Sequence, residues 1–349
     1  MRLRRSLPII VAVVLVAAAV VLVVFLRKHA PPEPARLLPG AEGFAYVNLQ
    51  WMRRANLLGE LPPVPHDPEY EQFIQSTGFQ FERDLDEAAF AVHYPNPTSV
   101  SQPRFSEIFV GKIEAERLRG YLSKLASSTE NYRSVEVYNV PVEGHTLRVT
   151  ILGVDTVAAS NVDDPQVIRG IINRSRKLAS PFAGPALLRQ YYKHVPLLSE
   201  TWGIFRVEPQ AGLHVASWAF IFEKPAVVVA SVRYLRALNL KAVGFMGSDE
   251  EAKKAAERFA TFFELFHAAE VSTSAQVPDP DVKALLDSLK IEQQKERVVM
   301  TAMVPIGFLR KALAEAPLAV APEAPKQIVP DTGPQPNETD RDKKTNTSR

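Results

Sequence analysis

Seven histidines and no cysteine limit the metal and nucleophilic chemistry of this chain. Without cysteine, thiol nucleophiles and thiolate metal ligands are excluded. No pair of histidines forms His-x-His or His-x-x-x-His, so no local motif predicts a metal site. His93, at the end of a predicted strand, and His145, in a predicted turn, are expected to be structural. Distant histidines could still converge in three dimensions.

Two positions between a predicted strand and a predicted helix have the context of a catalytic or phosphate-binding turn. Ser248 follows such a strand, but no Gly-x-Ser-x-Gly surrounds it, and its place predicts a helix cap. Gly111 and Lys112 have the context of a Walker loop. Ser106 stands where that loop needs glycine, and Ile113 where it needs serine or threonine. Neither turn predicts a nucleophile or a nucleotide site.

Paired carboxylates are the remaining polar candidates. Asp84 and Asp86, or Asp163 and Asp164, could bind a cation or act as acid and base. The first pair reads as a turn into a strand, and the second as a helix start. We therefore predict no catalytic, cofactor-binding or metal-binding residue. A hydrolase site formed only in three dimensions stays open as an alternative.

An aromatic stripe is the one apolar candidate for a ligand site. Phe259, Phe262, Phe263 and Phe266 fall on one face of a predicted helix. This spacing is typical of a packed core, which we favour. The alternative is a groove that carries an apolar ligand.

The elements around these candidates predict an α+β fold. Consecutive strand patterns, such as 44–49 and 88–94, are interrupted by amphipathic helices, the clearest at 114–126. This order favours mixed or antiparallel sheets with packed helices over a parallel α/β sheet. Segments 106–125 and 241–263 share a strand–turn–helix pattern, which indicates a duplicated strand–helix–strands unit.

An apolar run at residues 7–26 precedes this body. At about 1.5 Å per residue it is long enough to cross the roughly 30 Å hydrocarbon core of a bilayer, and no small-residue cleavage site follows it. We predict an uncleaved single-pass anchor in the inner (cytoplasmic) membrane; a cleaved signal peptide is the alternative. The basic residues of the cytoplasmic N-terminus, 1–6, favour an extracytoplasmic, periplasmic main domain.

The rest of the chain divides by composition. Residues 27–39 are predicted to form a Pro-rich stalk, and residues 316–349 a disordered tail. Between them lies an α+β domain, 40–315, with alternative halves at 40–200 and 201–315. The net charge of +2 is near balance, so nucleic acid is not an expected partner. The basic cluster 173–177 is expected to be a solvated helix end.

Three phrases carry a family resemblance: residues 37–53, 77–92 and 110–122. They resemble uncharacterised bacterial signal-anchored envelope proteins, a domain of unknown function for which no catalytic residue is known. Together with the anchor, this predicts a non-catalytic binding or envelope-organising protein without a cofactor. Its expected partners are the lipid bilayer, through residues 7–26, and an envelope protein. A periplasmic hydrolase and an apolar-ligand carrier are the alternatives.

Overall fold

The computed structural model describes residues 30–54, 66–94, 102–142, 144–176, 184–208, 221–234, 237–273 and 279–315. The predicted anchor at 7–26 and the predicted tail at 316–349 lie outside these ranges. Within them, none of the helices is both long and apolar enough to cross a bilayer.

The predicted stalk requires a correction, because part of it is folded into the domain. Residues Glu33–Leu37 form the short helix α2, which starts after Pro32 and carries Pro34 in its first turn. Proline is tolerated there because the first helical N–H groups have no intrahelical acceptor. Ala35 and Leu38 are fully buried, so the gain from burying apolar side chains overrides the extended conformation that proline favours.

One twelve-stranded sheet forms the body of the domain, with the order β11-β12-β10-β9-β8-β1-β2-β3-β7-β6-β5-β4. All of the strand pairings are antiparallel, which confirms an α+β fold built on an antiparallel sheet. The strands are β1 (Gly43–Asn48), β2 (Leu85–His93), β3 (Arg104–Gly111), β4 (Ser128–Tyr132), β5 (Val135–Val142), β6 (His145–Ile151), β7 (Thr156–Ser160), β8 (Thr201–Val207), β9 (Ala226–Tyr234), β10 (Leu238–Phe245), β11 (Lys290–Gln294) and β12 (Arg297–Val304).

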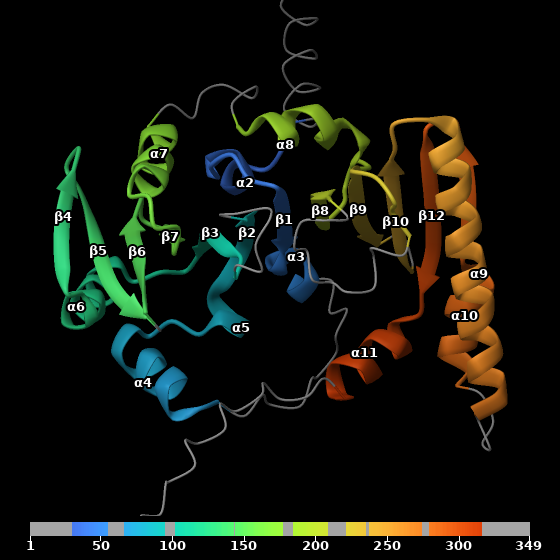
Figure 1. The fold of residues 1–349 in the computed structure, drawn as a ribbon. Coiled ribbons are helices and arrows are strands. Elements are labelled where there is room, and N and C mark those ends of the chain that lie inside the picture. Colours follow the sequence, from blue (N-terminus) through green and yellow to red (C-terminus); the bar gives the residue numbers. More distant parts are fainter. Residues whose placement is uncertain are drawn as a thin grey trace, which may run out of the picture.

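Helices lie on both faces of this sheet (Figure 1). They are α2, α3 (Leu49–Arg54), α4 (Pro68–Thr77), α5 (Phe81–Asp84), α6 (Ala115–Leu125), α7 (Gln166–Ser175), α8 (Ala186–Tyr191), α9 (Asp249–Thr273), α10 (Pro280–Ser288) and α11 (Ile306–Glu315), with a 3-10 turn at Tyr192–His194. The predicted helix at 114–126 is therefore found one residue shorter at each end.

The two halves of the sheet share a connection pattern. In each, three neighbouring strands lead into a helix, and a later strand returns to pair with the third: β7 with β3 after α6, and β12 with β10 after α9. The first strands of the halves, β1 and β8, pair with each other at the centre. The shared pattern agrees with the predicted unit, while a duplication of the sequence stays a prediction.

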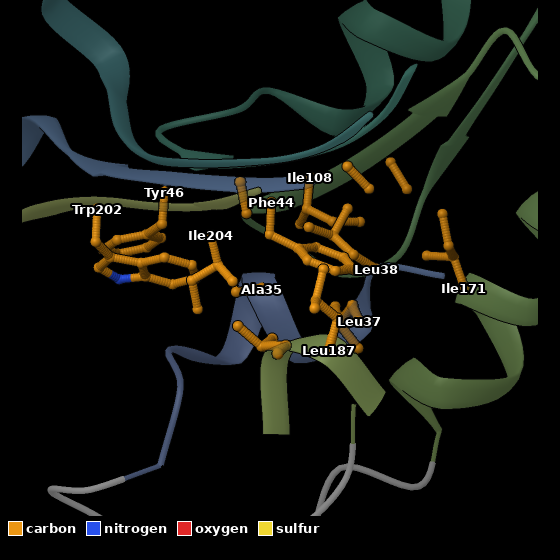
Figure 2. Close-up of a cluster of buried hydrophobic side chains, with 14 of the residues drawn as sticks. Ala35, Leu37, Leu38, Phe44, Tyr46, Ile108, Ile171, Leu187, Trp202 and Ile204 are labelled. Carbon is orange, nitrogen blue, oxygen red and sulfur yellow. The ribbon is translucent and has the colours of Figure 1, made fainter. Parts of the chain in front are cut away.

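The first face of the sheet, which carries Phe44, Tyr46 and Ile108, holds the largest core cluster. Side chains of α2, α7 and α8 cover it (Figure 2). The Tyr46 and Trp202 rings stack there with their centroids 5.6 Å apart. Burying large aromatic and branched side chains is the dominant stabilising contribution to such a core.

The second face is covered in two places. Near one end of the sheet, α9 packs Ala252 and Phe259 against β9 and β12. Near the other end, α4 and α6 lie over β3, β5, β6 and β7 (Figure 1). The second of these two contacts is incompletely filled, and the candidate site lies there.

Candidate functional site

An apolar cavity of about 330 Å³ lies between α4, α6 and the second face of the sheet. This volume falls within the range of small-molecule pockets, about 300–1,000 Å³. Its lining is predominantly aromatic and aliphatic. The lining residues are Phe73, Thr77, Phe79, Phe81, Glu107, Phe109, Ile113, Glu114, Leu118, Tyr121, Leu122, Leu125, Val140, Val142, Leu147, Val149, Val157 and Ala159.

One wall comes from α4 and the turn that follows it. Asp67 caps α4 by accepting a hydrogen bond from the Tyr70 N–H, and Gly78 ends it in the left-handed conformation at φ +73°. That conformation favours glycine, which commonly ends helices in this way. The turn brings Phe81 back over Phe73, and their rings stack with centroids 5.7 Å apart.

The second wall is one face of α6. Leu118, Tyr121, Leu122 and Leu125 recur at three- and four-residue steps, so they share a stripe that the helix turns toward the sheet. Tyr121 closes against α4 through an edge contact with Phe73, at 5.5 Å between centroids.

The floor consists of strand residues that share one side of the sheet. Val140 lies opposite Leu147, Val149 opposite Ala159, and Ala159 opposite Glu107. Because strand side chains alternate between faces, this register places all of them on the second face. The floor therefore draws on β3 and on the consecutive strands β5, β6 and β7, which α6 and β4 separate from β3 in the chain.

Three lining side chains are exposed at the mouth of the cavity. Phe81 is 38% exposed, Leu125 45% and Val142 43%. Large apolar side chains that gather around an opening are typical of a surface that binds an apolar partner. Filling the cavity would bury these side chains together.

Glu107 is a carboxyl on an otherwise apolar floor. It lies between Phe90 on β2 and Ala159 on β7. Burial raises the pKa of the Glu107 carboxyl, because the charged form is desolvated there. No sequence motif marks Glu107. A charged residue in the middle of a strand with apolar neighbours is the one signal that could have found it.

Phe259 and Phe263 of the predicted phenylalanine stripe pack into the core rather than lining this cavity, whereas Phe262 is 40% exposed. Phe259 is buried against Phe222, with ring centroids 6.0 Å apart, and Phe263 packs partly against the same cluster. The hollow next to Phe222 measures only about 20 Å³, the size of a water site. The side chain of Phe266 lies outside the described part. An apolar cavity does exist, but under α4 and α6 instead of α9.

In each carboxylate pair the two members have different partners, and Asp163 lies 3.8 Å from Arg104. Asp84 is buried and accepts hydrogen bonds from Arg83 and the Gln80 N–H, while Asp86 pairs with Arg53 at 2.5 Å. Asp164 accepts from the Gln166 N–H at the start of α7, as the sequence predicts. Within the described ranges, no three His, Asp or Glu side chains are arranged to hold a metal ion.

His93 forms part of a buried polar cluster. Its Nε2 lies 3.0 Å from the Ser106 hydroxyl, which lies 3.0 Å from the Ser160 hydroxyl. Histidine beside serine is the pairing that activates a nucleophile. Ser106, however, is fully buried on the first face, away from the cavity, so a substrate cannot reach its oxygen. Burial also lowers the pKa of the His93 imidazole.

The two predicted turns have structural roles. The Ser248 hydroxyl accepts from the Glu251 N–H, as expected of a helix cap. A side chain on Gly111 would overlap the backbone carbonyl of Asp84, so this glycine permits a close approach of two chain segments. Among residues 173–177, Arg176 donates to the Arg133 carbonyl. His145 opens β6, which follows a turn at Gly144.

No family model matches this chain, and no curated protein matches it. Among solved structures, crystal form III of TP0453 is similar over 81% of this chain and 98% of that chain, at 9% identity and a TM-score of 0.42. Crystal form IV of TP0453 covers 80% and 96%, at 8% identity and a TM-score of 0.41. A likeness this weak carries no information about function. The resemblance to signal-anchored envelope proteins stays a prediction.

Proposed function

We propose that this chain is a membrane-anchored, non-catalytic protein whose extracytoplasmic domain binds an apolar ligand in the cavity under α4 and α6. The observation that carries the proposal is a cavity of about 330 Å³ whose lining is almost entirely apolar. The anchor at 7–26 would hold the domain beside a bilayer, which is the natural source of such a ligand. An envelope protein that delivers or receives the ligand would be its partner.

The shape of the lining supports a binding role over a packing defect. Native interiors are packed to crystal-like density, and an unfilled space of this size costs the stability that its lining contacts would provide. Here the space is bounded by strands of the sheet, and Leu125 and Val142 in its lining are both exposed. Occupation by an apolar molecule would recover the missing contacts.

A photoreactive alkyl diazirine tests the proposal on the full-length chain in nanodiscs. After irradiation and digestion, labelled peptides identify the residues that the alkyl chain reaches. We expect labels in 73–81, 118–125 and 140–159, in addition to the predicted span at 7–26. Labels confined to 7–26 would overturn the proposal.

Two variants test whether the labelling takes place inside the cavity. Ala159→Phe adds a ring to the buried floor, and Val142→Trp adds one at the exposed mouth; each should reduce labelling of the cavity peptides. Val154→Trp is the matched control, because Val154 is 85% exposed in a turn away from this lining. Val142→Trp leaves the core untouched, so it remains informative even if Ala159→Phe folds poorly.

A further inference from the structure

A second groove, of about 460 Å³, lies near the opposite end of the sheet, and its lining combines charged and polar side chains with apolar ones. It spans β9, β10, β12 and β11, and the end of α10. Its lining residues are Pro196, Ser231, Arg233, Asn239, Leu240, Lys241, Ser288, Lys290, Thr301, Ala302 and Met303. Three of these side chains are cationic, and none is acidic.

Strand register places the cations in one row on the first face. Trp202 lies opposite Ser231, Ser231 opposite Lys241, Lys241 opposite Thr301, and Thr301 opposite Lys290. At Trp202 the row is buried in the core. Toward the edge strand β11, the residues in the row are Lys241, Thr301 and Lys290. The same side of the sheet thus passes from an apolar core to a cationic surface.

The row brings the cations within reach of one small ligand. Lys241 and Lys290 both flank Thr301, so their Cα atoms lie two strand spacings apart, roughly 10 Å. Arg233 lies on the same face of the sheet, two residues beyond Ser231 on β9. In the strand register it lies opposite Asn239 on β10. Side chains of this length can converge on a single anion above Thr301.

Several neighbours in the groove already use their hydrogen-bonding groups. The Ser231 hydroxyl donates to the Lys241 carbonyl, the Asn239 amide to the Ala237 carbonyl, and the Ser288 hydroxyl to the Leu285 carbonyl. In the ranges that the structure describes, Arg233 and Lys241 take part in no ion pair, and neither does Lys290.

One acidic residue, Glu292, lies beside the cationic row but out of register with it. Glu292 follows on β11, but it lies opposite Val299 instead of Thr301 and accepts from the Gln294 amide. Unpaired like charges on one surface repel each other, and a bound anion would relieve that repulsion.

A neighbouring histidine responds to the same positive field. The pKa of His194 is lowered by burial and then by the charges of Arg297, Lys193 and Lys241. Arg297 itself lies over the Phe245 ring, 5.0 Å from its centroid. These cations extend the positive surface beyond the groove.

We propose that Arg233, Lys241 and Lys290, with the Thr301 hydroxyl, form a binding site for the phosphate group of an anionic ligand. Phosphate offers several acceptor oxygens, and arginine and lysine are the side chains that proteins use to hold it. The phosphate could belong to a soluble phosphate ester or to a phospholipid headgroup. This site is separate from the apolar cavity and does not depend on the function proposed there.

Lysine acetylation measured by mass spectrometry tests the site on the full-length chain. In phosphatidylcholine nanodiscs, glycerol phosphate should slow acetylation of Lys241 and Lys290 several-fold if the ligand is soluble. In nanodiscs that contain phosphatidylglycerol, the same protection should appear without added phosphate if the ligand is a headgroup. Lys253 and Lys254 on α9 serve as internal references, because they lie outside the groove and should not change.

Arg233→Ala supplies the decisive variant, because it leaves both reporter lysines in place. We expect it to remove most of the protection at Lys241 and Lys290. Sodium chloride at equal ionic strength controls for general screening of charge. Protection in either arm that depends on Arg233 supports the site and identifies the source. No protection in either arm, or equal protection by sodium chloride, would overturn it.

Discussion

The Tyr46 hydroxyl on β1 donates a hydrogen bond of 2.9 Å to the Glu87 carboxylate on β2. Both groups are partly buried next to the main core. Burial raises the pKa of Glu87, while the hydrogen bond from Tyr46 acts in the opposite direction. The tyrosine therefore stabilises a carboxylate that its surroundings disfavour.

Replacing this donor should destabilise the domain in a pH-dependent way. Tyr46→Phe leaves the Glu87 carboxylate without its side-chain donor, and we expect a loss of about 1–3 kcal/mol at neutral pH. The pKa of Glu87 rises further in the variant, so the loss should shrink below its ordinary value of 4.5, where the carboxyl is protonated in both states. Urea unfolding of the wild type and the variant, at neutral pH and below pH 4.5, measures this difference in stability. An equal loss at both would contradict it.

Removing the charge at Glu107 should stabilise the domain at neutral pH, in contrast to Tyr46→Phe. The raised pKa means that wild-type stability falls as pH rises through the ordinary value of 4.5 toward the folded value. Glu107→Gln removes that penalty, so the variant should be more stable than wild type at neutral pH and nearly equal to it in acid. Thermal unfolding across this pH range is the measurement. A variant that is less stable at every pH would show that Glu107 has a stabilising partner.

Asp84 should behave as the usual stabilising carboxylate. The hydrogen bonds from Arg83 lower its pKa, and the Gln80 N–H also donates to it. Its contribution is therefore present above the ordinary pKa of 3.8 and is lost as pH falls through the lower folded value. Asp84→Asn should cost about 1–3 kcal/mol at neutral pH and less in acid. Asp86→Asn, which breaks a more exposed pair with Arg53, should cost under about 1 kcal/mol by the same denaturation assay.

Replacing two glycines in consecutive elements, Gly111 and Gly120, by alanine should change the stability of the domain in opposite directions. At Gly111 the added methyl group would overlap the Asp84 carbonyl, so Gly111→Ala should destabilise by about 1–3 kcal/mol. At Gly120, inside α6, nothing lies within 4 Å, and Gly120→Ala should stabilise by roughly 0.5–1 kcal/mol because alanine favours the helix. The unfolding midpoints of the two variants and the wild type, measured under the same conditions, test this prediction. Equal effects would contradict the close approach at Gly111.

Local features of this domain were predictable from the sequence because they depend on short-range geometry. The end of α4 at Gly78 follows from the need for a left-handed residue, and the cavity-facing stripe of α6 follows from helical spacing. Runs of consecutive strand patterns predicted mixed or antiparallel sheets, and the structure has the antiparallel one. The repeat of a helix or strand determines which of its residues share one face.

The two candidate sites, in contrast, exist only in the tertiary structure. The apolar cavity depends on how α4 and α6 meet the floor around Ala159, and no periodicity encodes a space between elements. The cationic groove depends on strand register, which sets Lys241 and Lys290 on either side of Thr301 although they are distant in the chain. The sequence alone determined which side chains could turn inward or outward. Packing and register, which arise from long-range contacts, decided which of them meet.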